Sequence, residues 1–137
     1  MTQYIHQLIT AGQLAIKELD QTVTYHDPCD LGRGSREYGA PRRVIGAIPG
    51  VKLVEMAHSR EKCLCCGGGG NLEMIDSGLS GEIAKAKIDE VLATGADTVI
   101  TACQQCVRTM ATYARRNKIK LDVMDIVQLV QRALKKN

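Results

Sequence analysis

The chain has 137 residues, of which 45% are apolar, and a formal net charge of +3 at pH 7. This length suffices for one hydrophobic core and is short for two, so the sequence predicts a single domain that spans residues 1–137. The chain contains no Phe or Trp and four Tyr, which argues against base stacking and bilayer anchoring, and therefore against nucleic-acid binding and direct membrane insertion.

The first part of the chain predicts a helix, a strand and a second helix. We expect a helix over residues 2–19, which sets residues 1–20 apart as an N-terminal helix from a core of residues 21–137. The β-branched and aromatic run at residues 22–26 predicts the first strand. Pro41 is tolerated in the first turn of the helix that follows.

The rest of the chain continues this alternation. Further strands are predicted at residues 51–56, 98–101 and 121–124. Apolar residues at helical spacing predict helices that end at Gly95 and at Asn117, and Asp125 is expected to cap a last helix. This order predicts an α/β fold, in which a parallel β-sheet carries helices on both faces.

The sequence also indicates where the protein works. No stretch approaches the ~20 consecutive apolar residues of a membrane span, and residues 1–13 carry His and Gln where a signal peptide is apolar. We therefore expect a cytoplasmic protein, peripheral to a membrane complex at most through its partners. In a reducing compartment, six cysteines indicate metal binding or redox chemistry rather than a disulfide framework.

Five of these cysteines follow the carboxyl ends of predicted strands: Cys29, the adjacent Cys65 and Cys66, and the pair Cys103 and Cys106. Parallel strands end at a shared edge of the sheet, where ligands bind, so we expect the five thiols to converge. The alternative, that each is a small buried apolar residue, explains five such positions poorly. Cys103 and Cys106 open a helix, whose positive end is expected to lower their thiol pKa values and prepare metal ligands.

Four consecutive glycines, Gly67, Gly68, Gly69 and Gly70, follow the adjacent cysteine pair. Glycine adopts positive φ readily, so consecutive N–H groups of this run can point at one anionic group, such as a sulfide-rich cluster or a substrate thiolate. We assign the four glycines to cofactor binding. The alternative interpretation is a flexible loop.

Two further residues are candidates beside the cysteines. His26 lies at the end of the first strand and is a candidate catalytic residue, able to donate to a ligand sulfur or to protonate a departing thiolate. The alternative is a histidine that satisfies a nearby backbone group. Cys63 falls outside the spacing pattern, and we interpret it as a loop bystander rather than a resolving thiol or substitute ligand.

The cysteine spacing resembles that of a known family. Thirty-five residues separate Cys29 from Cys65, and 36 separate Cys66 from Cys103. With its flanks at residues 26–33, 41–51 and 65–70, the pattern resembles the CCG cysteine-rich domain. This domain occurs in heterodisulfide reductase and in iron–sulfur oxidoreductases of glycolate, lactate and glycerol 3-phosphate. The resemblance runs from about Thr22 to the carboxyl terminus.

The resemblance implies that five residues are cluster ligands, namely Cys29, Cys65, Cys66, Cys103 and Cys106. In the heterodisulfide reductase branch such cysteines hold a noncubane [4Fe-4S] cluster that cleaves a disulfide, whereas other copies of the motif hold zinc. One departure is Asp30, because many relatives carry a His after the first cysteine. This departure puts a histidine role at that position in doubt.

Relatives commonly combine two CCG copies with a ferredoxin-type domain, whereas this chain has one copy and no ferredoxin motif. We therefore expect the carboxyl-terminal copy of a larger oxidoreductase, or a split subunit, rather than a complete enzyme. Its implied function is a cluster-binding redox domain that passes electrons between a ferredoxin-like iron–sulfur partner and a small molecule, either a disulfide/thiol or a 2-hydroxyacid.

Two alternatives stay open. The first is a structural zinc module that mediates subunit assembly without electron transfer, in which one of the motif cysteines is spare because zinc takes four ligands. The second is a metal-free thiol oxidoreductase that uses Cys103 and Cys106. It requires a thiol of low pKa at one of the two positions and activity that survives chelation.

Overall fold

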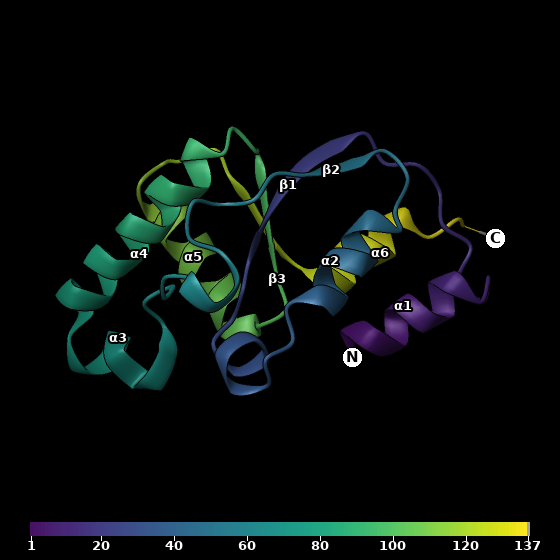
Figure 1. The fold of residues 1–137 in the computed structure, drawn as a ribbon. Helices are drawn as coiled ribbons and strands as arrows, with labels where there is room; N and C mark the ends of the chain where they lie inside the picture. The colour runs from purple at the N-terminus through teal and green to yellow at the C-terminus, as the bar shows by residue number, and fades with distance from the viewer. Residues whose placement is uncertain (137) are drawn as a thin grey trace.

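A computed structural model describes residues 1–136. Within this range four strands form an all-parallel sheet in the order β2-β1-β3-β4, and helices cover both of its faces (Figure 1). The strands are β1 (Gln21–His26), β2 (Val51–Leu53), β3 (Thr98–Thr101) and β4 (Asp122–Asp125). The α/β fold predicted from the alternation of strand and helix patterns is confirmed.

The two central strands place the ends of β1 and β3 side by side. His26, the last residue of β1, pairs with Thr101, the last residue of β3. From β1 the chain continues to β2 on one side, and it returns to β3 on the other side, so the strand order reverses between them. In open α/β sheets, ligands bind beyond the carboxyl ends of the strands at such a reversal.

Three helices pack on one face of the sheet, as Figure 1 shows: α1 (Thr2–Thr10), α2 (Gly39–Gly46) and α6 (Ile126–Ala133). Their apolar side chains surround Val23 and Tyr25, which point to this face from β1 and are fully buried. Successive residues of a strand face opposite sides of a sheet, so the neighbours of Val23 and Tyr25 in β1 point to the other face.

The other face is covered by α4 (Ser77–Ala93) and α5 (Gln104–Arg116). Val99 of β3 packs there against Ile88 of α4 and Met110 of α5. In the part of the chain that the structure describes, no helix combines the length and the apolar character that crossing a bilayer requires.

Two predicted elements are shorter in the structure. The N-terminal helix ends at Thr10 rather than at residue 19, because Gly12 turns the chain with a φ of +71°. The chain then runs to an isolated antiparallel bridge between Ile16 and Leu134. The second strand ends at Leu53 rather than at Met56, because Met56 leaves the sheet and packs in the core on the α4 side.

The predicted cap of the last helix is confirmed. The Asp125 carboxylate accepts a hydrogen bond of 2.8 Å from the backbone N–H of Val127, and the Gln128 side chain accepts one of 2.9 Å from the backbone N–H of Asp125. Each bond satisfies a backbone donor near the start of α6. Because Asp125 ends β4, the cap fixes where the chain leaves the sheet.

Candidate metal centre

A pocket of about 320 Å³ lies at the carboxyl ends of the strands, and its lining includes all five cysteines of the spacing pattern. Cys29 comes from the segment after β1, Cys65 and Cys66 from the loop after β2, and Cys103 and Cys106 from the start of α5. The topology therefore brings together thiols that lie far apart in the sequence. Their role as metal ligands stays a prediction.

The five thiols differ in exposure. All are free, Cys29 and Cys65 are exposed, Cys103 is half-buried, and Cys66 and Cys106 are buried. Local structure explains these positions: Cys29 precedes a π-helical turn at residues 30–34, and Cys103 is the residue from which α5 begins. The pocket thus has exposed thiols and buried thiols, so a group bound among them is partly reachable from solvent.

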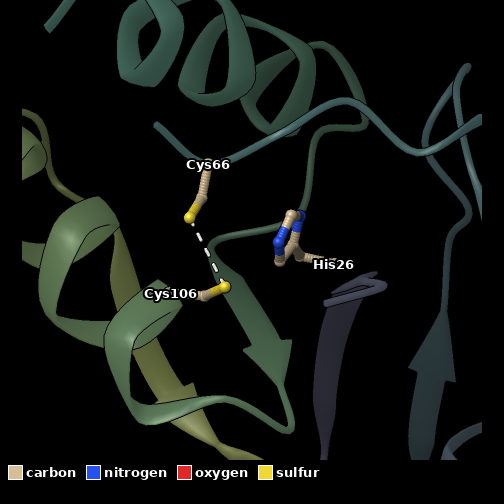
Figure 2. A group of neighbouring side chains, drawn as sticks. All are labelled: His26, Cys66 and Cys106. Carbon is tan, nitrogen blue, oxygen red and sulfur yellow. Dashed lines mark hydrogen bonds between the residues drawn. The ribbon is translucent and has the colours of Figure 1, made fainter. Parts of the chain in front are cut away.

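Three side chains form a compact set within this site. Ligand atoms of His26, Cys66 and Cys106 all lie within 4.8 Å of one another, and Figure 2 shows them converging from β1, the loop after β2, and α5. The Sγ atoms of Cys66 and Cys106 are hydrogen-bonded at 3.4 Å. Two sulfurs on one tetrahedral zinc lie about 3.8 Å apart. The spacing of this pair is therefore close to what one metal atom requires.

The hydrogen bond between Cys66 and Cys106 shifts the pKa values of both thiols. The hydrogen bond with Cys106 lowers the pKa of Cys66 against the effect of burial, and His26 and the backbone N–H of Gly68 act in the same direction. The same bond and burial raise the pKa of Cys106. The pKa of Cys106 is thus raised where the helix start alone is expected to lower it, because the hydrogen bond with Cys66 and burial oppose the helix dipole.

His26 has thiols as neighbours. It is 2% exposed, and its Nδ1 atom lies 3.5 Å from the Sγ atom of Cys63. Burial lowers the pKa of His26, but hydrogen bonds with Cys63 and Cys66 outweigh it, and the net shift is upward. The neighbouring sulfurs therefore favour the protonated form of the imidazole. Its catalytic role stays a prediction.

Cys63 is buried and contacts residues beside the cysteine site. A loop bystander would not make such contacts. Its side chain contacts His26, and its Sγ atom lies 3.7 Å from Nζ of Lys87. Burial raises the pKa of Cys63, but the hydrogen bond with His26 and the charges of His26 and Lys87 lower it overall.

The glycine run donates backbone N–H groups to two cysteine sulfurs. The N–H of Gly67 donates to the Sγ atom of Cys65 at 3.3 Å, and the N–H of Gly68 donates to Cys66. Gly68, Gly69 and Gly70 line the pocket, whereas Gly67 is not part of its wall. Consecutive N–H groups of this kind form a concave site for an anion. Cofactor binding by the four glycines stays a prediction.

Sequence reasoning missed Lys87, a charged residue that is fully buried. A signal for it was available, because Lys87 falls on the buried face of its helix, at helical spacing with Ala84, Ile88 and Val91. A lysine at such a position requires a buried partner, because charged side chains are rarely buried unpaired. Glu90, three residues further along the same helix, is at the spacing of an i,i+3 ion pair, so the sequence also offers the partner.

Comparison with known proteins supports a common origin of this site. Residues 23–111 match the CCG family of cysteine-rich domains. The chain is 38% identical over 135 residues to one component of the dihydromethanophenazine:CoB–CoM heterodisulfide reductase of Methanosarcina barkeri, an alignment that covers 98% of this chain and 33% of the relative.

Two bacterial proteins are also similar. A probable iron–sulfur-binding oxidoreductase of Bacillus subtilis is 33% identical over 136 residues, covering 97% of this chain and 19% of the relative. A probable membrane-anchored ferredoxin of Chromohalobacter salexigens is 38% identical over 133 residues, covering 96% and 20%. The chain thus spans a third or less of the length of these relatives. Because residues 23–111 carry all five pocket cysteines and most of the sheet, the chain belongs to the family of CCG cysteine-rich domains.

Proposed function

We propose that the chain is the cluster-binding redox domain of a heterodisulfide reductase-like oxidoreductase, present as a carboxyl-terminal copy of a larger enzyme or as a split subunit. The ligands of its iron–sulfur cluster, a noncubane [4Fe-4S] cluster in this proposal, are Cys29, Cys65, Cys66, Cys103 and Cys106. One observation carries the proposal: thiols from the ends of three parallel strands line the same pocket. Cysteine thiolates are the usual ligands of such clusters.

The donor set fits a thiolate-bound group. Cys66 and Cys106 are hydrogen-bonded thiols whose protons metal binding would release, since a bound thiol is deprotonated. The N–H groups of Gly67 and Gly68 donate to sulfurs, and such hydrogen bonds orient ligands and set reduction potentials. When bound, the cluster supplies one-electron transfer. The protein holds the thiolates, and His26 holds a proton beside them.

The names of the relatives support a role in electron transfer, because they include a heterodisulfide reductase, an iron–sulfur-binding oxidoreductase and a ferredoxin. In the proposed function, electrons enter from a ferredoxin-like partner domain or subunit and leave to a disulfide. The disulfide takes up two electrons and two protons and yields two thiols. The substrate alternative, a 2-hydroxyacid, instead releases two electrons and two protons and yields a 2-oxoacid. The exposed Cys29 and Cys65 support access by a small molecule.

Anaerobic reconstitution with iron and sulfide tests the proposal. We expect the protein to bind iron and sulfide together and to give an EPR signal on reduction or oxidation. Mutating a group that only supports a metal ligand typically lowers metal affinity by about tenfold or more. Replacing a ligand itself should cost at least as much, so we expect Cys66→Ser and Cys106→Ser to lower iron affinity by about tenfold or more. Iron and sulfide analysis of each variant provides the measurement.

Cys63→Ser is the matched control, because the Cys63 side chain contacts His26 and Lys87 and is not part of the pocket wall. This variant should keep its iron. Absence of bound iron in the native protein after anaerobic reconstitution would overturn the proposal. Stoichiometric zinc without iron would favour a structural zinc module, for which the compact set of His26, Cys66 and Cys106 offers nitrogen and sulfur ligands.

A further inference from the structure

A fully buried charge lies behind the cysteine site. The Lys87 side chain has 0% exposure, and its Nζ atom donates to Glu90 at 2.7 Å. The same atom contacts the sulfurs of Cys63 at 3.7 Å and Met56 at 3.8 Å. Lysine is almost never fully buried unless it is paired, and an ammonium in contact with two sulfurs gives up most of its hydration. The position therefore calls for a role beyond packing.

Glu90 connects this lysine to the segment that leads to the cysteine pair. Its carboxylate accepts hydrogen bonds from Lys87, from the backbone N–H of His58 at 2.6 Å and from the His58 ring at 2.9 Å. Burial raises the pKa of Glu90, but the bonds from Lys87 and His58 outweigh it and lower the pKa overall. A carboxylate with three donors fixes the chain at His58 against α4.

The contacts continue from Lys87 to the metal ligands. Cys63 lies between Lys87 and His26, at 3.7 Å from Nζ and 3.5 Å from Nδ1. The His26 ring in turn lies within 4.8 Å of the sulfurs of Cys66 and Cys106. A continuous line of polar contacts thus runs from helix α4 through Cys63 and His26 to the buried part of the pocket.

We propose that Lys87 and Glu90 are the positioning pair of the cysteine site: they hold Cys63 and the segment at residues 57–63 against α4, and they set the charge behind His26. The proposal concerns residues outside the ligand set, and its consequence for the cluster potential rests on the proposed iron–sulfur function. Lys87 is a positioning residue, because it acts on the ligands through Cys63 and His26.

The charges of the pair act on a bound cluster in opposite directions. A fixed positive charge favours the reduced cluster, which is the more negative state, and a buried charge is screened little by salt. Lys87 contacts Cys63, on the side of the cysteine site. Glu90 contacts His58, whose side chain is 53% exposed, so Glu90 lies nearer to solvent. Lys87→Met should therefore lower the midpoint potential, Glu90→Gln should raise it, and the double variant should lie between the two.

Hydrogen exchange of the protein without iron tests the positioning directly. In Lys87→Met the Glu90 carboxylate loses its buried partner and turns toward solvent, so the N–H groups of residues 57–66 should exchange roughly tenfold faster. Lys85→Met is the matched control: Lys85 lies on the same helix, pairs with Asp89 at 2.6 Å, and is 56% exposed. This variant should exchange at the native rate.

Redox titration of the reconstituted variants, followed by EPR, is the second measurement, because a merely structural role would not move the potential in opposite directions. The proposal is overturned if Lys87→Met leaves exchange at residues 57–66 unchanged, or if Lys87→Met and Glu90→Gln have the potential of Lys85→Met. If Lys87→Met does not fold, Glu90→Gln and the double variant decide. If the native protein binds no iron, the proposed function fails, and the exchange measurement alone decides this inference.

Discussion

Replacing Gly67 with alanine is expected to destabilise the domain by about 3 kcal/mol, through left-handed strain of about 1–2 kcal/mol and overpacking of about 1–3 kcal/mol. Gly67 has a φ of +92°, a backbone conformation that residues other than glycine rarely adopt. A Cβ atom there would lie 2.6 Å from the carbonyl oxygen of Ser80 and 3.2 Å from the backbone nitrogen of Ala84. Both are backbone atoms of α4, so no rotation of a side chain relieves the clash.

The change should also disrupt the cysteine site. The Gly67 carbonyl accepts a 2.7 Å hydrogen bond from the Ser80 hydroxyl, and its N–H donates to Cys65. If the loop moves away from α4 to relieve the clash, it carries Cys65 and Cys66 with it. We therefore expect both a lower midpoint of urea unfolding and a lower iron content after anaerobic reconstitution.

Gly69→Ala is the control, because a Cβ atom at Gly69 meets nothing within 4 Å and this residue is not among those with positive φ. Its stability should stay within about 0.5 kcal/mol of the native value. If Gly67→Ala and Gly69→Ala unfold at the same urea concentration, the loop is not held against α4 as the structure indicates. If Gly67→Ala keeps the native stability but loses iron, Gly67 affects only the geometry of the cysteine ligands.

The convergence of the five thiols could be anticipated from sequence because it depends on topology rather than on side-chain detail. Cys29, Cys66 and Cys103 each follow a strand pattern, and parallel strands joined by helices must end at a common edge of the sheet. The short, β-branched run at residues 98–101 predicts a strand with the boundaries that the structure has, and all four of its residues are buried there.

What could not be anticipated depends on contacts between distant elements. The pKa of Cys106 was predicted from its own helix, yet Cys66, which approaches from another loop, reverses the expected shift. Cys63 contacts Lys87 only because α4 packs beside that loop. Helix α1 is different: it ends at Thr10, and Gly12 just beyond it is a local stop signal that the expected helix over residues 2–19 passes over. Local patterns thus placed the ligand-bearing segments, and tertiary packing determined their protonation and support.

Arg42→Ala is expected to destabilise the domain by about 3–5 kcal/mol, the usual effect of leaving one member of a buried ion pair alone. The Arg42 guanidinium bonds both carboxylate oxygens of Asp27 at 2.8 Å, bonds Glu55 at 2.6 and 3.0 Å, and donates to the carbonyl of Tyr38 at 2.8 Å. It also lies 5.1 Å from the ring centre of Tyr25. All five of its donor hydrogens are used.

The expected loss is large because the Asp27 carboxylate is buried, so removing Arg42 leaves a buried charge without its ion-pair partner. The Asp27 side chain is 1% exposed, and that of Arg42 is 9% exposed. Asp27 also accepts a 2.7 Å hydrogen bond from the backbone N–H of Arg60, and it directly follows His26. The pair therefore joins the end of β1 to the loop that leads to Cys63, and removing Arg42 should loosen two walls of the cysteine site at once.

Chemical unfolding of a set of variants measures this contribution and separates it from charge alone. Arg42→Lys keeps the positive charge but loses the planar fork, so its stability should fall between that of the native protein and that of Arg42→Ala.

Arg132→Ala is the control for an exposed pair: the Arg132 and Asp122 side chains are 53% and 46% exposed, and removing Arg132 should cost no more than about 1 kcal/mol of stability. Asp27→Asn combined with Arg42→Ala should cost clearly less than the sum of the single changes, since the second change no longer strands a buried charge. Equal losses for Arg42→Ala and Arg132→Ala would show that Asp27 finds water or another donor, and that the joint between β1 and the cysteine loop does not depend on this ion pair.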